Sequence, residues 1–147
     1  MTMTQATHGG EANLYTAKTH TVGGRERGTA RSSDGNLDIK LAIPGSERTG
    51  SNPEQLLAAG WSAACLEGAI ARVARSKKIS LPSGPEIDAE IDLNLADDGL
   101  FLRARLNVRL DGVDAKAAEA IVEQAHLTCP FSKALRGNVD VEIKLTP

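Results

Sequence analysis

The sequence has 147 residues, of which 41% are hydrophobic, and a formal net charge of −2. Its 17 lysines and arginines are scattered rather than clustered, so no basic surface for nucleic acid is indicated. No uninterrupted apolar run approaches the roughly 18 residues of a membrane span, and the polar start lacks the apolar core of a signal peptide. Residues 1–11 predict a flexible tail, which leaves 12–147 as a single domain. The expected protein is soluble and cytoplasmic and binds neither nucleic acid nor membrane.

Three β segments are expected before the first helix. Residues 14–22 and 29–33 alternate in polarity around "GGRERG", which predicts a hairpin or a bent strand pair with Arg25 on or beside its turn. After the turn signal "SDGN", residues 37–43 alternate as a half-buried strand and are ended by "PGSERTGS".

A long helix is expected to start with a clear capping device. Asn52 can cap it, Pro53 suits the first helical position, and Glu54 favours the positive end of the helix dipole. The helix should run to about Lys77. Because it is apolar around much of its circumference, it should be buried against a sheet or a partner.

The clearest supersecondary motif follows the linker "LPSGPE". Residues 86–96 and 100–110 alternate on either side of "DDG", which predicts two antiparallel strands with a tight turn at Asp98 and Gly99.

The last third of the chain predicts two helices and a strand. Asp114 should cap a helix over 115–128, whose apolar face is formed by Ala118, Ile121, Val122 and Ala125. A short helix after Pro130 and a strand over 139–145 complete the chain. This order of elements predicts an α+β fold, with a curved antiparallel sheet packed on one or two helices.

The chain has only two cysteines, and each has a plain structural interpretation. Cys65 lies among alanines inside the long helix and could be a small core residue. Cys129 could be a buried residue that ends a helix. If Pro130 opens a new helix, however, Cys129 takes its cap position, where a thiolate faces unpaired backbone N–H groups and would be reactive. In the cytoplasm a cysteine pair is more often catalytic, redox-sensing or metal-binding than a structural disulfide.

Metal and cofactor sites have weak support. His126 and Cys129 are three residues apart and could share a helix face, but His8 and His20 lie in less ordered regions, so a zinc site lacks its third and fourth ligands. The glycine-rich "GGRERG" lacks the spacing of a dinucleotide loop. No metal and no bound cofactor are expected.

Several motifs together resemble one known family. These are "LYTA" (14–17), "GGR" (23–25), "SSDG" (32–35), "NPEQLLAAGWSAAC" (52–65) and "AHLTCPFSKALRGNVDV" (125–141). In this order they resemble the organic hydroperoxide resistance (Ohr) proteins of the Ohr/OsmC family, from about residue 14 to the end.

The resemblance implies a two-cysteine peroxidase that reduces organic hydroperoxides to alcohols. Cys65 would be the peroxidatic thiolate, and Cys129 would resolve its sulfenic acid as a disulfide. Arg25 would stabilise the thiolate, and Glu54 would position Arg25. The resemblance also implies curved sheets around a long central helix in an intertwined homodimer. The disulfide would be reduced by an external dithiol, either dihydrolipoamide or a lipoylated protein.

The sequence departs from the family pattern at one point, because "GWSAAC" carries one alanine more before the cysteine. One extra residue turns everything beyond it by about 100° in a regular helix, so a π-bulge or a bend is expected near residues 60–64. Glu54 and Cys65 would also lie about 16 Å apart along a straight helix. We therefore hypothesise that either the helix breaks near Gly60 or Glu54 serves the site of the partner subunit, and we favour the second.

Two other functions stay open at this point. One is a hydrophobic small-molecule-binding protein of the same fold with weak turnover, and the other is a redox sensor whose disulfide alters partner binding. The presence of Cys65, Cys129, Arg25 and Glu54 together favours the peroxidase, because a pure binding protein does not need all four.

Overall fold

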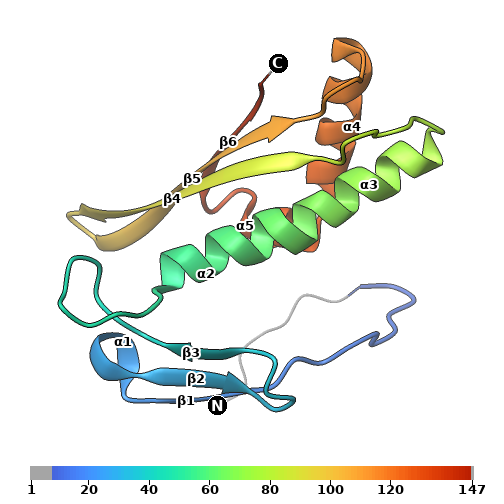
Figure 1. Cartoon of the computed structure of the whole chain (residues 1–147). Coiled ribbons are helices and arrows are strands. Elements are labelled where there is room, and N and C mark those ends of the chain that lie inside the picture. Colours follow the sequence, from blue (N-terminus) through green and yellow to red (C-terminus); the bar gives the residue numbers. More distant parts are fainter. Residues whose placement is uncertain (1–7, 147) are drawn as a thin grey trace. The chain divides into compact units, whose positions relative to one another are not determined.

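The computed structural model describes residues 8–146 and contains two compact units, residues 1–51 and residues 52–147. We describe each unit by itself (Figure 1). The predicted tail, residues 1–11, lies mainly outside the described residues, and residues 8–18 contain no helix or strand. That residues 12–147 form one domain stays a prediction.

The first unit is a small antiparallel sheet with strand order β1-β2-β3. The strands span Thr19–Val22, Thr29–Ser32 and Asp38–Lys40, so the predicted hairpin is confirmed but its strands are shorter than expected. The segment "GGRERG" is not a simple turn. It contains a one-turn helix, α1 (Gly24–Arg27), entered through Gly23, whose φ of 79° favours glycine.

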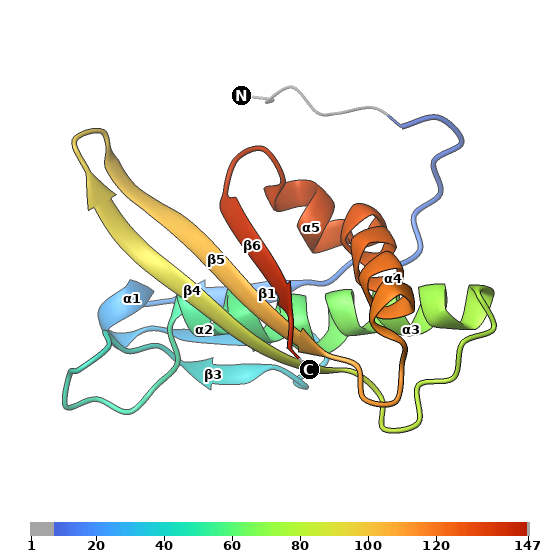
Figure 2. The same ribbon diagram turned by 90° about the horizontal axis from the view of Figure 1, so that it is seen from above.

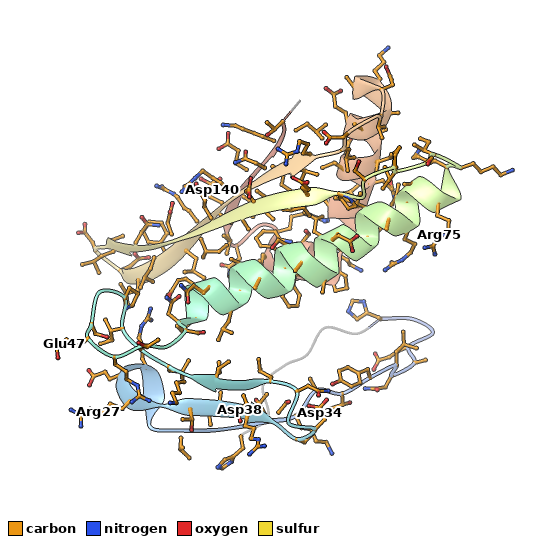
Figure 3. The ribbon with its side chains drawn as sticks, viewed as in Figure 1. Arg27, Asp34, Asp38, Glu47, Arg75 and Asp140 are labelled. Carbon is orange, nitrogen blue, oxygen red and sulfur yellow. The ribbon has the colours of Figure 1, made fainter. Side chains whose placement is uncertain are left out.

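The predicted turn between β2 and β3 is built around Asp34, which Figure 3 labels. Its carboxylate accepts hydrogen bonds from Ser32 Oγ at 2.5 Å and from the Asn36 N–H at 3.0 Å. These bonds favour the ionised form, so they hold the pKa of Asp34 below its usual value. Gly35 supplies the positive φ of 77° that the turn needs.

The second unit begins with the predicted long helix, which is continuous but changes its winding. It consists of α2 (Pro53–Ala59), the π-helical segment η1 (Gly60–Leu66) and α3 (Glu67–Ser76). The capping device is confirmed, because Asn52 Oδ1 accepts a hydrogen bond from the Gln55 N–H at 2.9 Å. The expected π-bulge is also confirmed, and the alternative of a break near Gly60 is wrong.

The π segment keeps Trp61 on the same buried face as the side chains that follow it. Trp61, Leu66 and Ile70 are all 0% exposed, although the first two are five residues apart. A regular α-helix would place residues five apart about 140° from each other around the axis. The wider turn, in which the Glu67 N–H donates to the carbonyl of Ser62, brings Trp61 and Leu66 to one face.

The sheet of the second unit has strand order β4-β5-β6. Strands β4 (Glu86–Ala96) and β5 (Gly99–Arg109) form the predicted antiparallel hairpin, but its two-residue loop is Asp97 and Asp98, one residue earlier than expected. Strand β6 (Asp140–Leu145) pairs parallel to β5, so the expectation of a wholly antiparallel sheet is wrong. Because the chain passes through two helices between β5 and β6, it returns to the same end of the sheet and runs in the same direction.

Two helices lie between β5 and β6. Helix α4 (Ala115–Thr128) starts at the predicted cap, where Asp114 Oδ2 accepts from the Ala117 N–H at 3.2 Å. It packs across α3 (Figure 2), and its four predicted apolar residues are all buried. Helix α5 (Pro130–Leu135) follows after the single residue Cys129.

The core of the second unit lies between this sheet and its helices. Its largest fully buried aliphatic side chains come from α3, β5 and α4 as well as η1, and they are Leu66, Ile70, Leu106, Val108 and Ile121. By length and composition, the helix over Pro53–Ser76 is also apolar enough to cross a membrane. Leu66 and Ile70 of this helix are buried in the core, and 33% of its most apolar 18-residue stretch is buried.

The opposite face of the same sheet is charged. Arg105 on β5 bonds Glu90 at 2.7 Å and Asp92 at 2.5 Å, both on β4. The Arg105 guanidinium holds the pKa of Asp92 below its usual value. Asp140, labelled in Figure 3, is the first residue of β6, and its Oδ2 atom lies 3.7 Å from Nε of Arg103 on β5. The sheet therefore buries one face and exposes the other, as its alternating sequence predicts.

Candidate active site

Cys65 and Cys129 meet inside the second unit. Cys65 is partly buried on η1, and Cys129 is 0% exposed at the junction of α4 and α5. Both are free thiols, and their sulfur atoms lie 2.7 Å apart. A disulfide bond is about 2.05 Å long, so only a small movement separates this pair from a covalent bond.

Cys129 occupies the cap position that the sequence predicted, but its sulfur does not cap α5. It is the last residue before Pro130 and makes no side-chain hydrogen bond to the helix. The Phe131 N–H instead donates to the sulfur of Cys65 at 3.4 Å. The start of α5 therefore does not bond the Cys129 sulfur, and this fully buried side chain lies against Cys65 instead.

Burial raises the pKa of the Cys65 thiol to about 11, and the hydrogen bond with Cys129 adds to this effect. The Phe131 N–H and the positive charge of Arg72 act in the opposite direction but are weaker. These surroundings keep the thiol protonated at neutral pH. A positive charge beside the sulfur would favour the thiolate.

Two contacts between η1 and α5 were not foreseen from the sequence. The indole N–H of Trp61 donates to Ser132 Oγ at 3.0 Å, and both side chains are 0% exposed. The ring of Phe131 packs over Gly60, where an added Cβ would lie 3.2 Å from the ring atom Cε2. A buried polar aromatic side chain usually has a hydrogen-bond partner, but the sequence does not indicate which one.

The other two predicted site residues lie in different units. Arg25 is half-buried on α1 in the first unit, and Glu54 is half-buried in the first turn of α2 in the second. The structure therefore brings together the two cysteines, whereas the joint action of Arg25, Glu54 and Cys65 stays a prediction.

His126 is a half-buried histidine at the edge of the core, and its surroundings favour the neutral form. Burial and the nearby Arg136 lower its pKa, and its Nδ1 atom is buried without a hydrogen-bond partner. Among residues 8–146, no group of three or more His, Cys, Asp or Glu side chains could hold a metal ion. The zinc alternative thus lacks a ligand set in the described part of the chain.

The fold and the site define an α+β protein with an apposed pair of free thiols. Residues 44–144 match the family model described as "OsmC-like protein". The organic hydroperoxide resistance protein of Xanthomonas axonopodis pv. citri is 42% identical over an alignment of 139 residues that covers 92% of this chain and 96% of that protein. The chain belongs to the Ohr/OsmC family.

Solved structures agree with this assignment. An organic hydroperoxide resistance protein from Legionella pneumophila superposes with a TM-score of 0.86 at 40% identity, over 92% of this chain and 100% of that chain. OhrB of Bacillus subtilis gives a TM-score of 0.84 at 39% identity, over 91% and 100%. The relatives support a redox role connected with resistance to organic hydroperoxides.

Proposed function

We propose that the protein is a thiol peroxidase that reduces organic hydroperoxides to alcohols through Cys65 and Cys129. The observation that carries the proposal is the 2.7 Å distance between the two free sulfurs, which lie on separate helical segments. The names of the relatives supply the substrate class.

In the first step the Cys65 thiolate attacks the distal oxygen of the hydroperoxide. The O–O bond breaks, the sulfur becomes a sulfenic acid and the alcohol leaves after it takes up a proton. Cys65 suits this role better than Cys129, because Cys65 is partly exposed whereas Cys129 is 0% exposed. Cys129 then attacks the oxidised sulfur, so that an S–S bond forms, the S–O bond breaks and water leaves.

The thiolate needs a cation, and we assign this role to Arg25, which Glu54 would position. Burial raises the pKa of the Cys65 thiol, and a cation beside the sulfur would act against that effect. We expect Arg25→Met to slow alkylation of Cys65 by iodoacetamide at pH 8 by about tenfold or more, because the cation favours the thiolate. Alkylation is measured from pH 6 to pH 11 in a Cys129→Ser background, with Arg27→Met as the matched control.

Glu54→Gln is expected to act in the same direction as Arg25→Met but more weakly. Mixed dimers of Glu54→Gln and Cys65→Ser subunits would locate the site that Glu54 serves. One wild-type site should appear if Glu54 acts across the dimer, whereas a site with only the activity of Glu54→Gln would place Glu54 in its own subunit's site. An alkylation profile unchanged in both Arg25→Met and Glu54→Gln would remove both residues from the mechanism.

Substrate preference tests the proposal as a whole. Cys65 packs against the hydrophobic core, and its neighbour Phe131 is 40% exposed, so an apolar substituent finds favourable contact there. We expect one equivalent of cumene hydroperoxide to consume both thiols rapidly, with a mass loss of two hydrogens, and hydrogen peroxide to react much more slowly. Thiol titration and mass spectrometry measure this. Persistence of both thiols would contradict the peroxidase and leave the small-molecule-binding function.

The remaining proposals concern assembly and reductant. We propose a homodimer, which is supported by the exposed leucines Leu95 and Leu100 at the end of the β4–β5 hairpin, 78% and 66% exposed. Sedimentation velocity distinguishes a dimer from a monomer. We further propose that a cytoplasmic dithiol of the dihydrolipoamide type, free or carried by a protein, reduces the disulfide. Turnover with dihydrolipoamide but not with thioredoxin would agree with this choice of reductant.

A further inference from the structure

Two hydrogen-bonded pairs of side chains, not one, connect η1 with the start of α5. We call this contact the seam. The sulfurs of Cys65 and Cys129 form the first pair, and the indole of Trp61 with the hydroxyl of Ser132 forms the second. Trp61 precedes Cys65 by four residues, and Ser132 follows Cys129 by three. Each cysteine therefore lies about one helical turn from one partner of the hydrogen bond.

The Trp61–Ser132 bond is well placed to hold the two segments together. Both side chains are 0% exposed, so no bulk water can replace either partner. The bond joins residues 71 positions apart in the chain, and no sequence-local contact would substitute for it. Phe131, packed over Gly60, adds apolar contact at the same seam.

We propose that Trp61 and Ser132 are positioning residues for disulfide formation. Their hydrogen bond holds Cys129 where its sulfur reaches the sulfur of Cys65. The inference rests on the proposed function for its place in the cycle, because the step concerned is the attack of Cys129 on the sulfenic acid of Cys65. In that step the S–S bond forms, the S–O bond breaks, and the hydroxyl leaves as water with the proton of the Cys129 thiol.

This positioning decides how the sulfenic acid is used. A second hydroperoxide molecule can oxidise the sulfenic acid to a sulfinic acid, and is itself reduced to the alcohol. Only a rapid attack by Cys129 prevents that reaction. Loosening the seam should therefore increase sulfinic acid formation, whereas the first attack of Cys65 on the hydroperoxide should stay unchanged.

The test uses Trp61→Phe, Ser132→Ala and the double variant. Each single change should lower the equilibrium constant for forming the Cys65–Cys129 disulfide against dithiothreitol by about tenfold, because the two sulfurs are then no longer held together before they bond. The ratio of sulfinic acid to disulfide after excess cumene hydroperoxide, measured by mass spectrometry, should rise by a similar factor. Because the two residues act through one bond, the double variant should be no worse than the more affected single variant.

Ser62→Ala is the matched control. Ser62 is a buried serine on the same segment, but its hydroxyl donates to the carbonyl of Ala58 at 2.7 Å, within its own helix. We expect a wild-type equilibrium and a wild-type ratio from this control.

The outcomes separate the positioning role from the proposed function. Wild-type equilibria in Trp61→Phe and Ser132→Ala would overturn the positioning role, and so would an equal effect of Ser62→Ala. If Trp61→Phe does not fold, Ser132→Ala alone decides. If the wild-type protein does not react with hydroperoxide, the proposed function fails. The equilibrium with dithiothreitol still tests whether the Trp61–Ser132 hydrogen bond positions the two cysteines.

Discussion

Cys65→Ser is expected to abolish hydroperoxide reduction, and Cys129→Ser to stop the cycle one step later. A serine hydroxyl at position 65 cannot form a sulfenic acid, so the rate should fall to that of the uncatalysed reaction. In Cys129→Ser the first step remains, because the partly exposed thiol of Cys65 is intact. One equivalent of cumene hydroperoxide should then add one oxygen to the protein instead of removing two hydrogens.

Mass spectrometry of the oxidised proteins and consumption of hydroperoxide measure these outcomes. Cys129→Ser should also form sulfinic acid readily with excess hydroperoxide, since nothing resolves the sulfenic acid. Activity retained in Cys65→Ser would make Cys129 the nucleophile despite its complete burial. Disulfide-linked dimers as the main product of Cys129→Ser would instead indicate resolution between subunits.

Features with a local cause could be predicted from the sequence. The caps at Asn52 and Asp114 need only a side-chain oxygen and a backbone N–H three residues later, and both are present. The β4–β5 hairpin follows from alternation on both sides of a short polar turn. The π segment was also expected, but only from the family resemblance, against which this helix carries one alanine more before Cys65.

Features that depend on contacts between distant residues could not be predicted in this way. The direction of β6 depends on how α4 and α5 pack before the chain returns to the sheet. Cys65 and Cys129 are 64 positions apart, and only the family resemblance suggested that they meet. No pattern in the sequence connects Trp61 with Ser132, because a hydrogen bond across a core leaves no periodic signal.

Inserting one more alanine between Ala63 and Ala64 is expected to lower the stability of the protein and to disturb the pair of thiols. The π segment already absorbs one extra residue and keeps Trp61 and Leu66 on the buried face. A further residue would turn one of these side chains away from the core by about 100°. Loss of burial of a large side chain lowers the free energy of unfolding by about 2–5 kcal/mol.

Deletion of Ala63 is the matched control, because it changes the length of the same segment by one residue but should cause little damage. Ala63 is exposed, so its removal sacrifices no buried surface. Trp61 and the leucine at 66 would then be four residues apart, which a regular α-helix places within about 40° of each other. We expect the free energy of unfolding of this variant to lie within about 1 kcal/mol of the wild-type value. Its equilibrium for disulfide formation should be unchanged.

Urea unfolding and the dithiothreitol equilibrium, measured on both variants, separate the two possible roles of the π segment. If insertion is damaging and deletion is tolerated, the segment is a way of fitting one surplus residue into a helix while Trp61 and Leu66 stay on one buried face. If deletion also breaks the thiol pair, the wide turn itself places Cys65 against Cys129 and is part of the site. If insertion is tolerated, the burial of Trp61 and Leu66 does not fix the register of this helix.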